Sequence, residues 1–263
     1  MLIPLVVPPT VPLWQVALAT AFAVIIGKEA FGGTGMNILN VALTARAFLY
    51  FAYPSQISGD VWTYIGDNAM VAGYSGATPL SIGANAVASG TNMMSSMAEF
   101  GTGWADNMYS FSNMFFGFMP GSIGETSVLM CLIGALVLIV TGVGSWKIIV
   151  SVFAGAFGMG LILNAFGSNP FMELPAYYHL VIGGLAFGAV FMATDPVTAA
   201  QTEKGKWIYG LGIGMLTVVI RVLNPAYPEG IMLAILFFNV FAPLIDFYVV
   251  KANKQRRLKR ATV

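Results

Sequence analysis

Long apolar stretches recur along this chain, and most of them approach the length that a helix needs to cross a lipid bilayer. A bilayer core about 30 Å thick requires roughly 20 apolar residues in a helix. Seven stretches come near that length: roughly 12–27, 37–53, 126–143, 147–166, 174–193, 205–221 and 229–250. The first two are short and contain glycine or charge, so they are expected to be tilted or broken. The pattern predicts an all-α, polytopic integral membrane protein.

The second and third stretches are joined by a very different segment, Pro54–Glu125, which is rich in Gly, Ser, Asn and Met. A connection this long is uncommon and is more often functional than idle. Its runs MMSSMAEF and NMFFGFM indicate that part of it lies against the membrane rather than in free water.

The composition agrees with a membrane protein. Hydrophobic residues make up 57% of the 263 residues and charged residues only 9%, whereas soluble domains carry about 25% charged residues. The net charge is +1, and the few basic residues form no stripe, so no nucleic acid partner is expected. The single cysteine, Cys131, and the single histidine, His179, argue against a disulfide framework or a metal site. Both are expected to be packing or interface residues.

The basic residues predict the orientation of the chain. Six of the twelve Lys and Arg residues lie in Lys251–Arg260, which places the C-terminus in the cytoplasm. When the spans are counted back from the C-terminus, Lys147, Lys204 and Lys206 also lie on the cytoplasmic side. No Lys or Arg occurs from Ala47 to Trp146. The long segment, with Thr78, is therefore predicted to be extracytoplasmic.

The same count predicts a missing N-terminal portion. Seven spans with the C-terminus inside would put Met1 outside, yet MLIPLVVPPTVPLWQ has neither a basic n-region nor a cleavage site. An absent portion with an odd number of spans would resolve this. Ile26–Gly32 also resembles Ile182–Gly188 at five of seven positions, which favours two related halves. Inverted repeats are common in transporters, and about seven of an expected ten spans would then be present.

Ser75-Gly76-Ala77-Thr78-Pro79 is the most informative short motif, and it can be interpreted in two ways. Thr78 with Pro79 behind it is typical of a helix start. A helix N-terminus with free N–H groups is also a natural seat for a phosphate. Because no Lys or Arg lies nearby, backbone amides would be the main local means of holding an anion. The motif alone leaves both interpretations open.

Two acids near the ends of apolar stretches are candidates for an ion path. Asp195 stands in Thr-Asp-Pro-Val-Thr, where neighbouring hydroxyl and carbonyl oxygens would suit Na⁺. Asp195 could equally cap a short helix that Pro196 begins. Asp246 could pair with Arg221 or lie near the basic tail.

Three further charges accompany the first two apolar stretches. Charges within a membrane are costly and usually pair or face a pathway. Lys28 is expected to extend its ammonium to the cytoplasmic interface, and Glu29 is a third candidate for the ion path. Arg46 needs a partner; a salt bridge to Glu29 or a neighbouring subunit, or contact with a flavin or lipid, would supply one.

Four stretches together resemble the NqrB/RnfD family, which includes the B subunit of the bacterial Na⁺-translocating NADH:quinone reductase. They are GKEAFGGTGMNILNVALTARAFLYFAYP (27–54), GYSGATPLS (73–81), FMATDPVTA (191–199) and NPAYPEGIMLAILFFNVFAPLIDFYVVKANKQRR (224–257). The last stretch, with its basic tail, is closer to NqrB than to RnfD. Where the family usually has an acidic residue just before GYSGAT, this chain has Ala72, with Asp67 nearby.

The resemblance implies a function and a set of partners. Thr78 would carry FMN through a phosphoester that a flavin transferase makes outside the cytoplasm, with Ser75, Gly76 and Ala77 completing the motif. The chain would belong to a Na⁺-pumping NADH:ubiquinone reductase of the bacterial inner membrane, among lipids and the subunits NqrA, NqrC, NqrD, NqrE and NqrF. A non-covalent riboflavin and ubiquinone are also implied. No catalytic residue is assigned, and the candidates for the Na⁺ path are Asp195, Asp246 and Glu29.

The resemblance also implies a urea-transporter-like arrangement of inverted repeats. Residues 1–54 would be the remainder of the first repeat, 55–125 the flavin-bearing segment, 126–250 the second five-helix repeat and 251–263 a cytoplasmic tail. The alternatives are an RnfD-like flavinylated subunit of a ferredoxin-linked ion pump and a cofactor-free, urea-transporter-like channel.

Overall fold

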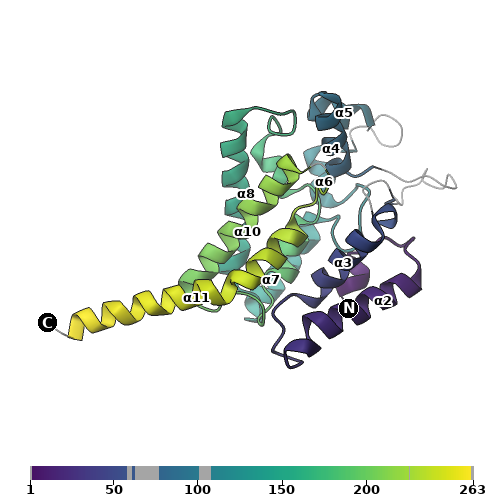
Figure 1. The fold of residues 1–263 in the computed structure, drawn as a ribbon. Coiled ribbons are helices and arrows are strands. Elements are labelled where there is room, and N and C mark those ends of the chain that lie inside the picture. The colour runs from purple at the N-terminus through teal and green to yellow at the C-terminus, as the bar shows by residue number, and fades with distance from the viewer. Residues whose placement is uncertain (1, 58–60, 63–76, 101–107, 225, 262–263) are drawn as a thin grey trace.

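The computed structural model describes residues 2–57, 61–62, 77–100, 108–224 and 226–261, and the prediction of an all-helical fold is confirmed for them. Most helices run in one bundle, with a layer of shorter helices at one end (Figure 1). The helices are α1 (Leu2–Leu5), α2 (Leu13–Gly27), η1 (Glu29–Phe31), α3 (Val41–Ala52), η2 (Pro54–Gln56), α4 (Pro79–Ser89), α5 (Met93–Phe100), α6 (Phe111–Phe116), α7 (Val128–Val140), α8 (Trp146–Phe166), η4 (Ala176–Leu180), α9 (Leu185–Phe187), the π-helical turn η5 (Gly188–Met192), α10 (Glu203–Leu223) and α11 (Ile231–Ala261).

Four helical segments of the described residues are long and apolar enough to cross a membrane, and each coincides with a predicted stretch. They are Leu13–Phe31, Trp146–Phe166, Glu203–Leu223 and Ile231–Arg260. Two further predicted stretches form shorter apolar helices, α3 and α7. These six segments give the chain the architecture of a polytopic membrane protein.

The remaining predicted stretch, 174–193, is a broken helix rather than a continuous one. It is divided into η4, α9 and η5, and the break lies at Gly183, whose φ of +65° is unfavourable for other residues. A Cβ at Gly183 would lie 2.5 Å from Cδ1 of Leu80 in α4. The break therefore lets α4 approach the middle of this stretch.

Glycines on the facing sides of α8 and α10 allow these two helices to pack very closely. A Cβ at Gly214 would lie 2.1 Å from the carbonyl oxygen of Val152, and one at Gly155 would lie 2.4 Å from that of Leu211. Small residues at such contacts are typical of helix packing in membranes. Helix α11 packs on α10 as well, and the three helices form one wall of the bundle (Figure 1).

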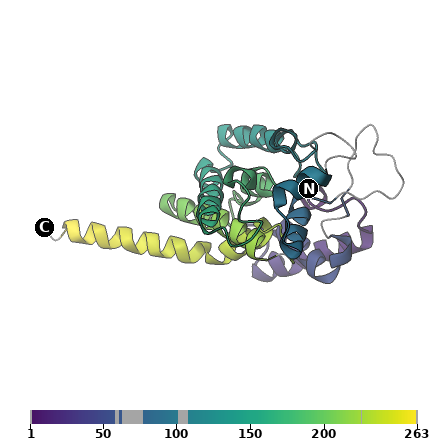
Figure 2. The ribbon, with the colours of Figure 1, turned by 90° about the horizontal axis from the view of Figure 1, so that it is seen from above.

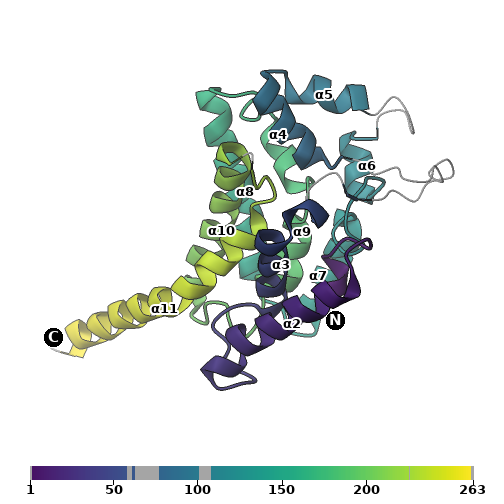
Figure 3. The ribbon, with the colours of Figure 1, turned by 45° about the vertical axis from the view of Figure 1, so that its right-hand side comes forward.

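Helices α2 and α3 pack together beside that wall (Figure 3). The rings of Phe22 and Phe48 stack with centroids 4.7 Å apart. Asn40 caps α3 by accepting hydrogen bonds from the N–H groups of Ala42 and Leu43, and its amide also donates to the carbonyl of Met192 at 3.4 Å. The cap thus ties α3 to η5 and fixes where α3 starts.

The two ends of the molecule differ in character. Helices α4, α5 and α6 lie together at one end, and α11 extends from the other end as an exposed helix that carries the basic tail (Figures 1 and 2). In the similar segments Ile26–Gly32 and Ile182–Gly188, a three-residue helix occupies the matching positions, η1 at Glu29–Phe31 and α9 at Leu185–Phe187. The two segments differ afterwards, because η1 ends at Gly32 whereas η5 continues from α9.

Candidate functional site

Thr78 begins α4, as the sequence predicts. It is the N-cap residue, with φ −73° and ψ 156°, and Pro79 follows at the first helical position. Its Oγ1 accepts a hydrogen bond from the N–H of Ser81 at 3.3 Å. Pro79 has no N–H, and those of Ser81 and Ile82 bond Thr78, so this end of α4 presents the N–H of Leu80 and a partial positive charge beside the Thr78 hydroxyl.

The backbone on either side of Thr78 is held in place. The hydroxyl of Tyr109 donates to the carbonyl of Ala77 at 2.6 Å, and the N–H of Ile82 donates to the carbonyl of Thr78 at 3.0 Å. The predicted motif residues Ser75 and Gly76 lie outside the described residues.

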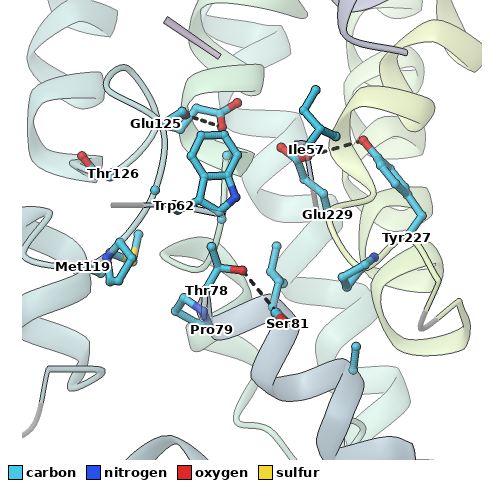
Figure 4. A pocket seen from close by; sticks show the side chains of 18 of the residues that line it. Ile57, Trp62, Thr78, Pro79, Ser81, Met119, Glu125, Thr126, Tyr227 and Glu229 are labelled. Carbon is cyan, nitrogen blue, oxygen red and sulfur yellow. Dashed lines mark hydrogen bonds between the residues drawn. The ribbon is translucent and has the colours of Figure 1, made fainter. Parts of the chain in front are cut away.

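Thr78 opens into a cavity of about 240 Å³ between the α4 layer and the bundle (Figure 4). Its walls come from segments far apart in the sequence. They include Arg46 and Tyr50 of α3, Trp62, the start of α4, the loop before α7, Gly183 and Gly184, and residues 226–229.

Arg46 forms two salt bridges at this cavity, and neither is to the predicted partner. Its Nη1 lies 2.5 Å from Oε1 of Glu125, and its Nη2 lies 2.8 Å from Oε1 of Glu229. The Arg46 side chain is only 6% exposed. The prediction of a bridge to Glu29 is wrong, because Glu29 lies in η1 with 56% of its side chain exposed and pairs with Lys28 at 3.9 Å. A planar guanidinium suits two carboxylates because it offers several fixed donors.

Glu125 is held by two short contacts at its carboxylate. The Ser122 hydroxyl donates to Glu125 Oε2 at 2.6 Å, in addition to the bond from Arg46. A Cβ at Gly184 would lie 2.7 Å from Glu125 Oε1. The absence of a side chain at Gly184 therefore makes room for this carboxylate.

Glu229 is held more loosely, in the turn between α10 and α11. Its carbonyl accepts from Nε of Arg221 at 3.1 Å, and its carboxylate has a long contact of 3.4 Å with the Tyr227 hydroxyl. Burial raises the pKa of Glu229 from 4.5 to about 7, although Arg46 opposes this shift and Glu125 adds to it. Burial therefore favours the neutral form of Glu229 up to a higher pH than for an exposed glutamate.

Trp62 supplies an aromatic surface to the cavity. It is 5% exposed, and in the view of Figure 4 its indole lies between the side chains of Thr78 and Glu125. A buried aromatic ring beside an aliphatic hydroxyl is suited to stacking against a planar group attached to that hydroxyl.

Asp195 and Asp246 lie far from this cavity, around the N-terminus of α10. Asp246 does not pair with Arg221; it accepts from the N–H groups of Gln201 and Thr202 at 2.7 and 2.9 Å and from the Thr202 hydroxyl at 2.5 Å. Arg221 lies near the other end of α10, about 28 Å away at 1.5 Å per residue, and its guanidinium donates to backbone carbonyls.

Asp195 makes the local hydrogen bonds of a turn. Its carboxylate accepts from the Thr198 hydroxyl at 2.8 Å and from the N–H of Val197 at 3.4 Å. Thr194 donates its hydroxyl to the carbonyl of Val190 instead. The side-chain oxygens that were expected to suit a cation therefore make hydrogen bonds within this turn. Among the described residues, no group of three or more His, Cys, Asp or Glu could hold a metal ion.

Cys131 and His179 are both buried, at 2% and 1% exposure. The Cys131 thiol lies 3.8 Å from the carbonyl of Gly124, and the His179 ring lies 5.9 Å from that of Phe171. These contacts are those of packing residues.

Glu125 and Glu229 belong to the site although the sequence did not identify them. The sequence offered one indirect signal: Arg46 needs a carboxylate partner, and that partner must be one of only 11 acidic residues in the chain. Nothing local in the sequence shows which of those residues comes near α3.

Comparisons with known proteins agree with the resemblance noted above. The family model described as "NQR2, RnfD, RnfE family" matches residues 1–255. The chain is 54% identical over 259 residues to the B subunit of the Na(+)-translocating NADH-quinone reductase of Chromohalobacter salexigens, an alignment that covers 97% of this chain and 58% of that protein. The proteins of the same name from Ectopseudomonas mendocina and Klebsiella pneumoniae are 53% and 52% identical, with 97% of this chain and 60% and 59% of those proteins covered. The chain thus spans less than two thirds of the length of these relatives.

Proposed function

This chain belongs to the NQR2, RnfD, RnfE family, and from that premise we propose that it is a flavin-bearing membrane subunit of a Na⁺-translocating NADH–quinone reductase. Thr78 is the proposed attachment point, with FMN joined to its Oγ1 through a phosphoester. The names of the relatives favour this complex over a ferredoxin-linked pump or a channel.

The observation that carries the proposal is that the Thr78 hydroxyl lies both at the N-terminus of α4 and at the wall of a cavity. A phosphate on Oγ1 would lie beside the N-terminus of α4, where a negative charge is favoured, and near the N–H groups of Leu80 and Ser81, since Pro79 has no N–H and that of Ile82 bonds the Thr78 carbonyl. Arg46 lines the same cavity, but it is paired with the carboxylates of Glu125 and Glu229, so the start of α4 would provide most of the local compensation for the phosphate charge.

The described residues can accommodate the phosphate of FMN at the start of α4, but their cavity is too small to enclose the whole molecule. The cavity of about 240 Å³ is smaller than the roughly 300–1,000 Å³ of typical sites for such ligands. We therefore expect the ring system to lie partly beyond the cavity and to stack on Trp62. When bound, FMN supplies the electron-transfer chemistry.

The chain's own residues would position this group. Tyr109 holds the carbonyl of Ala77, and the first turn of α4 fixes Thr78. The buried cluster of Arg46, Glu125 and Glu229 would set the charge of the opposite wall.

The remaining elements of the proposal concern the membrane and the ion. The chain would lie in the bacterial inner membrane with Thr78 outside and the basic tail in the cytoplasm. Asp195 and Asp246 would then be near the cytoplasmic end of α10, and with Glu29 they remain candidates for Na⁺ uptake. Ubiquinone, riboflavin and the subunits NqrA, NqrC, NqrD, NqrE and NqrF are the proposed partners.

The test is in-gel flavin fluorescence of the denatured subunit, taken from membranes of cells that make the complex and the flavin transferase. The fluorescent band is expected to disappear in Thr78→Ala and to remain in Thr91→Ala, which removes an exposed hydroxyl just beyond α4. A band that persists in Thr78→Ala at equal protein level would overturn the assignment.

A further inference from the structure

We infer that a groove between α10 and α11 binds the headgroup of an anionic phospholipid. The groove has a volume of about 350 Å³, and its walls include Lys204 and Ile208 of α10 and Arg256 of α11. No described residue lines both this groove and the Thr78 cavity. The inference therefore does not depend on the flavin proposed at Thr78.

The groove follows one face of α11 and the facing side of α10. Its residues on α11 recur every three or four positions and are Ile245, Tyr248, Val249, Ala252, Asn253 and Arg256. At 3.6 residues per turn, such spacing places side chains on one side of a helix. Lys204 and Ile208, four positions apart, line the groove from α10. The two helices thus form one continuous groove rather than a scattered set of surface residues.

This groove lies where α10 and α11 reach the surface of the bilayer. About 20 helical residues cross the bilayer core, so the apolar part of α11, counted from Ile231, ends near Val250, just before the basic run that starts at Lys251. Asp246 accepts from the N–H of Thr202 at 2.9 Å, which puts the start of α10 at a similar level, and α11 continues beyond it (Figure 1). The groove therefore crosses the boundary between the apolar core and the headgroups.

Apolar and basic side chains are separated along the groove. Ile208, in the second turn of α10, and Ile245 lie toward the membrane core. Lys204, in the first turn of α10, and Arg256, beyond the apolar part of α11, lie toward the headgroups. Lysine and arginine stems lie along apolar surface while their charges reach the interface. An anionic phospholipid has the same order, with its acyl chains in the core and its phosphate at the interface.

The two cations of the groove are not neutralised by carboxylates. In the part of the chain that the structure describes, no Asp or Glu lines the groove, and neither Lys204 nor Arg256 forms a salt bridge. The two acids next to its lining residues in sequence have other partners: Glu203 pairs with two other lysines, and Asp246 accepts from backbone N–H groups before α10. The groove therefore offers a net positive charge to an anion.

A phospholipid uses more of the groove than a free phosphate would. A free phosphate would contact only the basic end, whereas an acyl chain joined to the same phosphate would also cover Ile208, which is 51% exposed. Tyr248, at 61% exposure, is a residue type that is enriched at the level of the headgroups. Basic pockets between membrane helices are suited to anionic headgroups. These features favour a lipid over an acidic segment of a neighbouring subunit.

The experiment is photolabelling of the intact purified complex in detergent micelles. The probe is phosphatidylglycerol with a diazirine on its acyl chain near the glycerol, and labelled peptides of α10 and α11 are identified by mass spectrometry. Each basic side chain near a membrane surface strengthens binding to anionic lipid about fivefold. Lys204→Gln/Arg256→Gln should therefore raise the half-saturating fraction of lipid by about 30-fold. The control Lys254→Gln/Arg257→Gln removes the same charge from residues that do not line the groove and should stay close to the native value.

A second pair of variants tests the groove itself without changing any charge. Ala252→Trp should fill the groove and lower the labelling. Val250→Trp adds the same side chain at a position that is 57% exposed and does not line the groove, so its labelling should remain native. Equal labelling of these two variants would show that the lipid does not occupy the groove.

The remaining outcomes identify what the groove binds. Unlabelled phosphatidylglycerol should compete with the probe, and phosphatidylcholine, which has no net negative charge, should compete less. Equal competition by inorganic phosphate would assign the groove to a free anion and overturn the inference. So would equal loss of labelling in the two double variants. Absence of label from the native complex, with loss of another subunit in Lys204→Gln/Arg256→Gln, would show that the groove is a protein interface instead.

Discussion

Nη1 of Arg46 lies 2.5 Å from Oε1 of Glu125, a residue 79 positions further along the chain. The pair connects α3 to the loop before α7, and the two side chains are only 6% and 10% exposed. With Glu229 as a second partner of Arg46, it connects three distant segments around one cavity. The Arg46 cluster therefore supports both the fold and the proposed site.

Replacing Arg46 should destabilise the protein strongly. Arg46→Ala would leave two carboxylates buried without their cation, and breaking a buried pair in this way costs about 3–5 kcal/mol. Arg46→Lys should recover only part of this loss, because a single ammonium cannot reproduce the two directed contacts of a guanidinium. The measurement is thermal unfolding of the purified complex, monitored by tryptophan fluorescence.

The matched control for Arg46 is Lys28→Ala. Lys28 lies 3.9 Å from Glu29, with side chains 31% and 56% exposed, and exposed pairs contribute about 0–1 kcal/mol. Equal losses of stability in the Arg46 and Lys28 variants would contradict the structural importance of the Arg46 cluster.

Gly184→Ala should disturb the cavity without removing any charge. The new Cβ would lie 2.7 Å from Oε1 and 2.8 Å from Cδ of Glu125, so the carboxylate must leave the position in which it bonds Arg46 and Ser122. Overpacking of this kind costs about 1–3 kcal/mol. Stability and the fraction of subunit carrying flavin should both fall.

A suitable comparison for Gly184 is Gly158→Ala, where an added Cβ meets nothing within 4 Å in α8. Alanine should be neutral or stabilising there, by up to about 1 kcal/mol. If Gly184→Ala behaves like Gly158→Ala, the close approach of Glu125 to Gly184 is not a constraint in the folded protein.

Trp62 should quench the fluorescence of the attached flavin. Its buried indole lines the cavity beside Thr78, and an aromatic ring stacked on a flavin shortens the excited-state lifetime. We expect a severalfold increase in native-state flavin fluorescence in Trp62→Leu, with little change in Trp207→Leu, since Trp207 packs on Trp146 at the far end of the bundle. Equal fluorescence in native protein and Trp62→Leu would show that the ring does not contact this side chain.

Glu229 should make the stability of the folded protein depend on pH. Burial raises the pKa of Glu229 from 4.5 to about 7 in the folded state, so the folded protein binds this proton more tightly than the unfolded chain does. The resulting stabilisation is fully present below pH 4.5, is lost as the pH rises to about 7, and is then constant.

The pH effect is measured as the difference in unfolding free energy between native protein and Glu229→Gln from pH 5 to 8. Subtraction removes the contribution of carboxylates common to both proteins. Between pH 5 and 7, the unfolding free energy of the native protein should fall relative to that of Glu229→Gln. A difference that is independent of pH would show that Glu229 titrates at its ordinary value.

The parts of this structure that could be predicted from sequence are those governed by local rules. The Thr78–Pro79 helix start follows from N-cap chemistry and is present in the fold. The apolar stretches that became α8, α10 and α11 follow from hydropathy and length. The bend at Gly183 was not predicted, because it depends on contact with Leu80 of α4, a helix distant in sequence.

The partners of the charged residues could not be predicted for the same reason. Arg46 finds Glu125 and Glu229, and Asp246 finds the backbone of Thr202, only after distant helices pack. A charge requires a partner on physical grounds, but the sequence does not specify which one the fold brings near. The cavity behind Thr78, which depends on these partners, was therefore not foreseen.

Mass spectrometry of the peptide that contains Thr78 decides whether this subunit carries a covalent flavin. The peptide is taken from the complex purified from cells that make the flavin transferase. We predict that Thr78 carries an added mass equal to FMN less one water, as a phosphoester requires, and that fragmentation places this mass on the Thr78 side chain. An unmodified Thr78 in complex that oxidises NADH and reduces quinone would show that the proposed attachment is wrong.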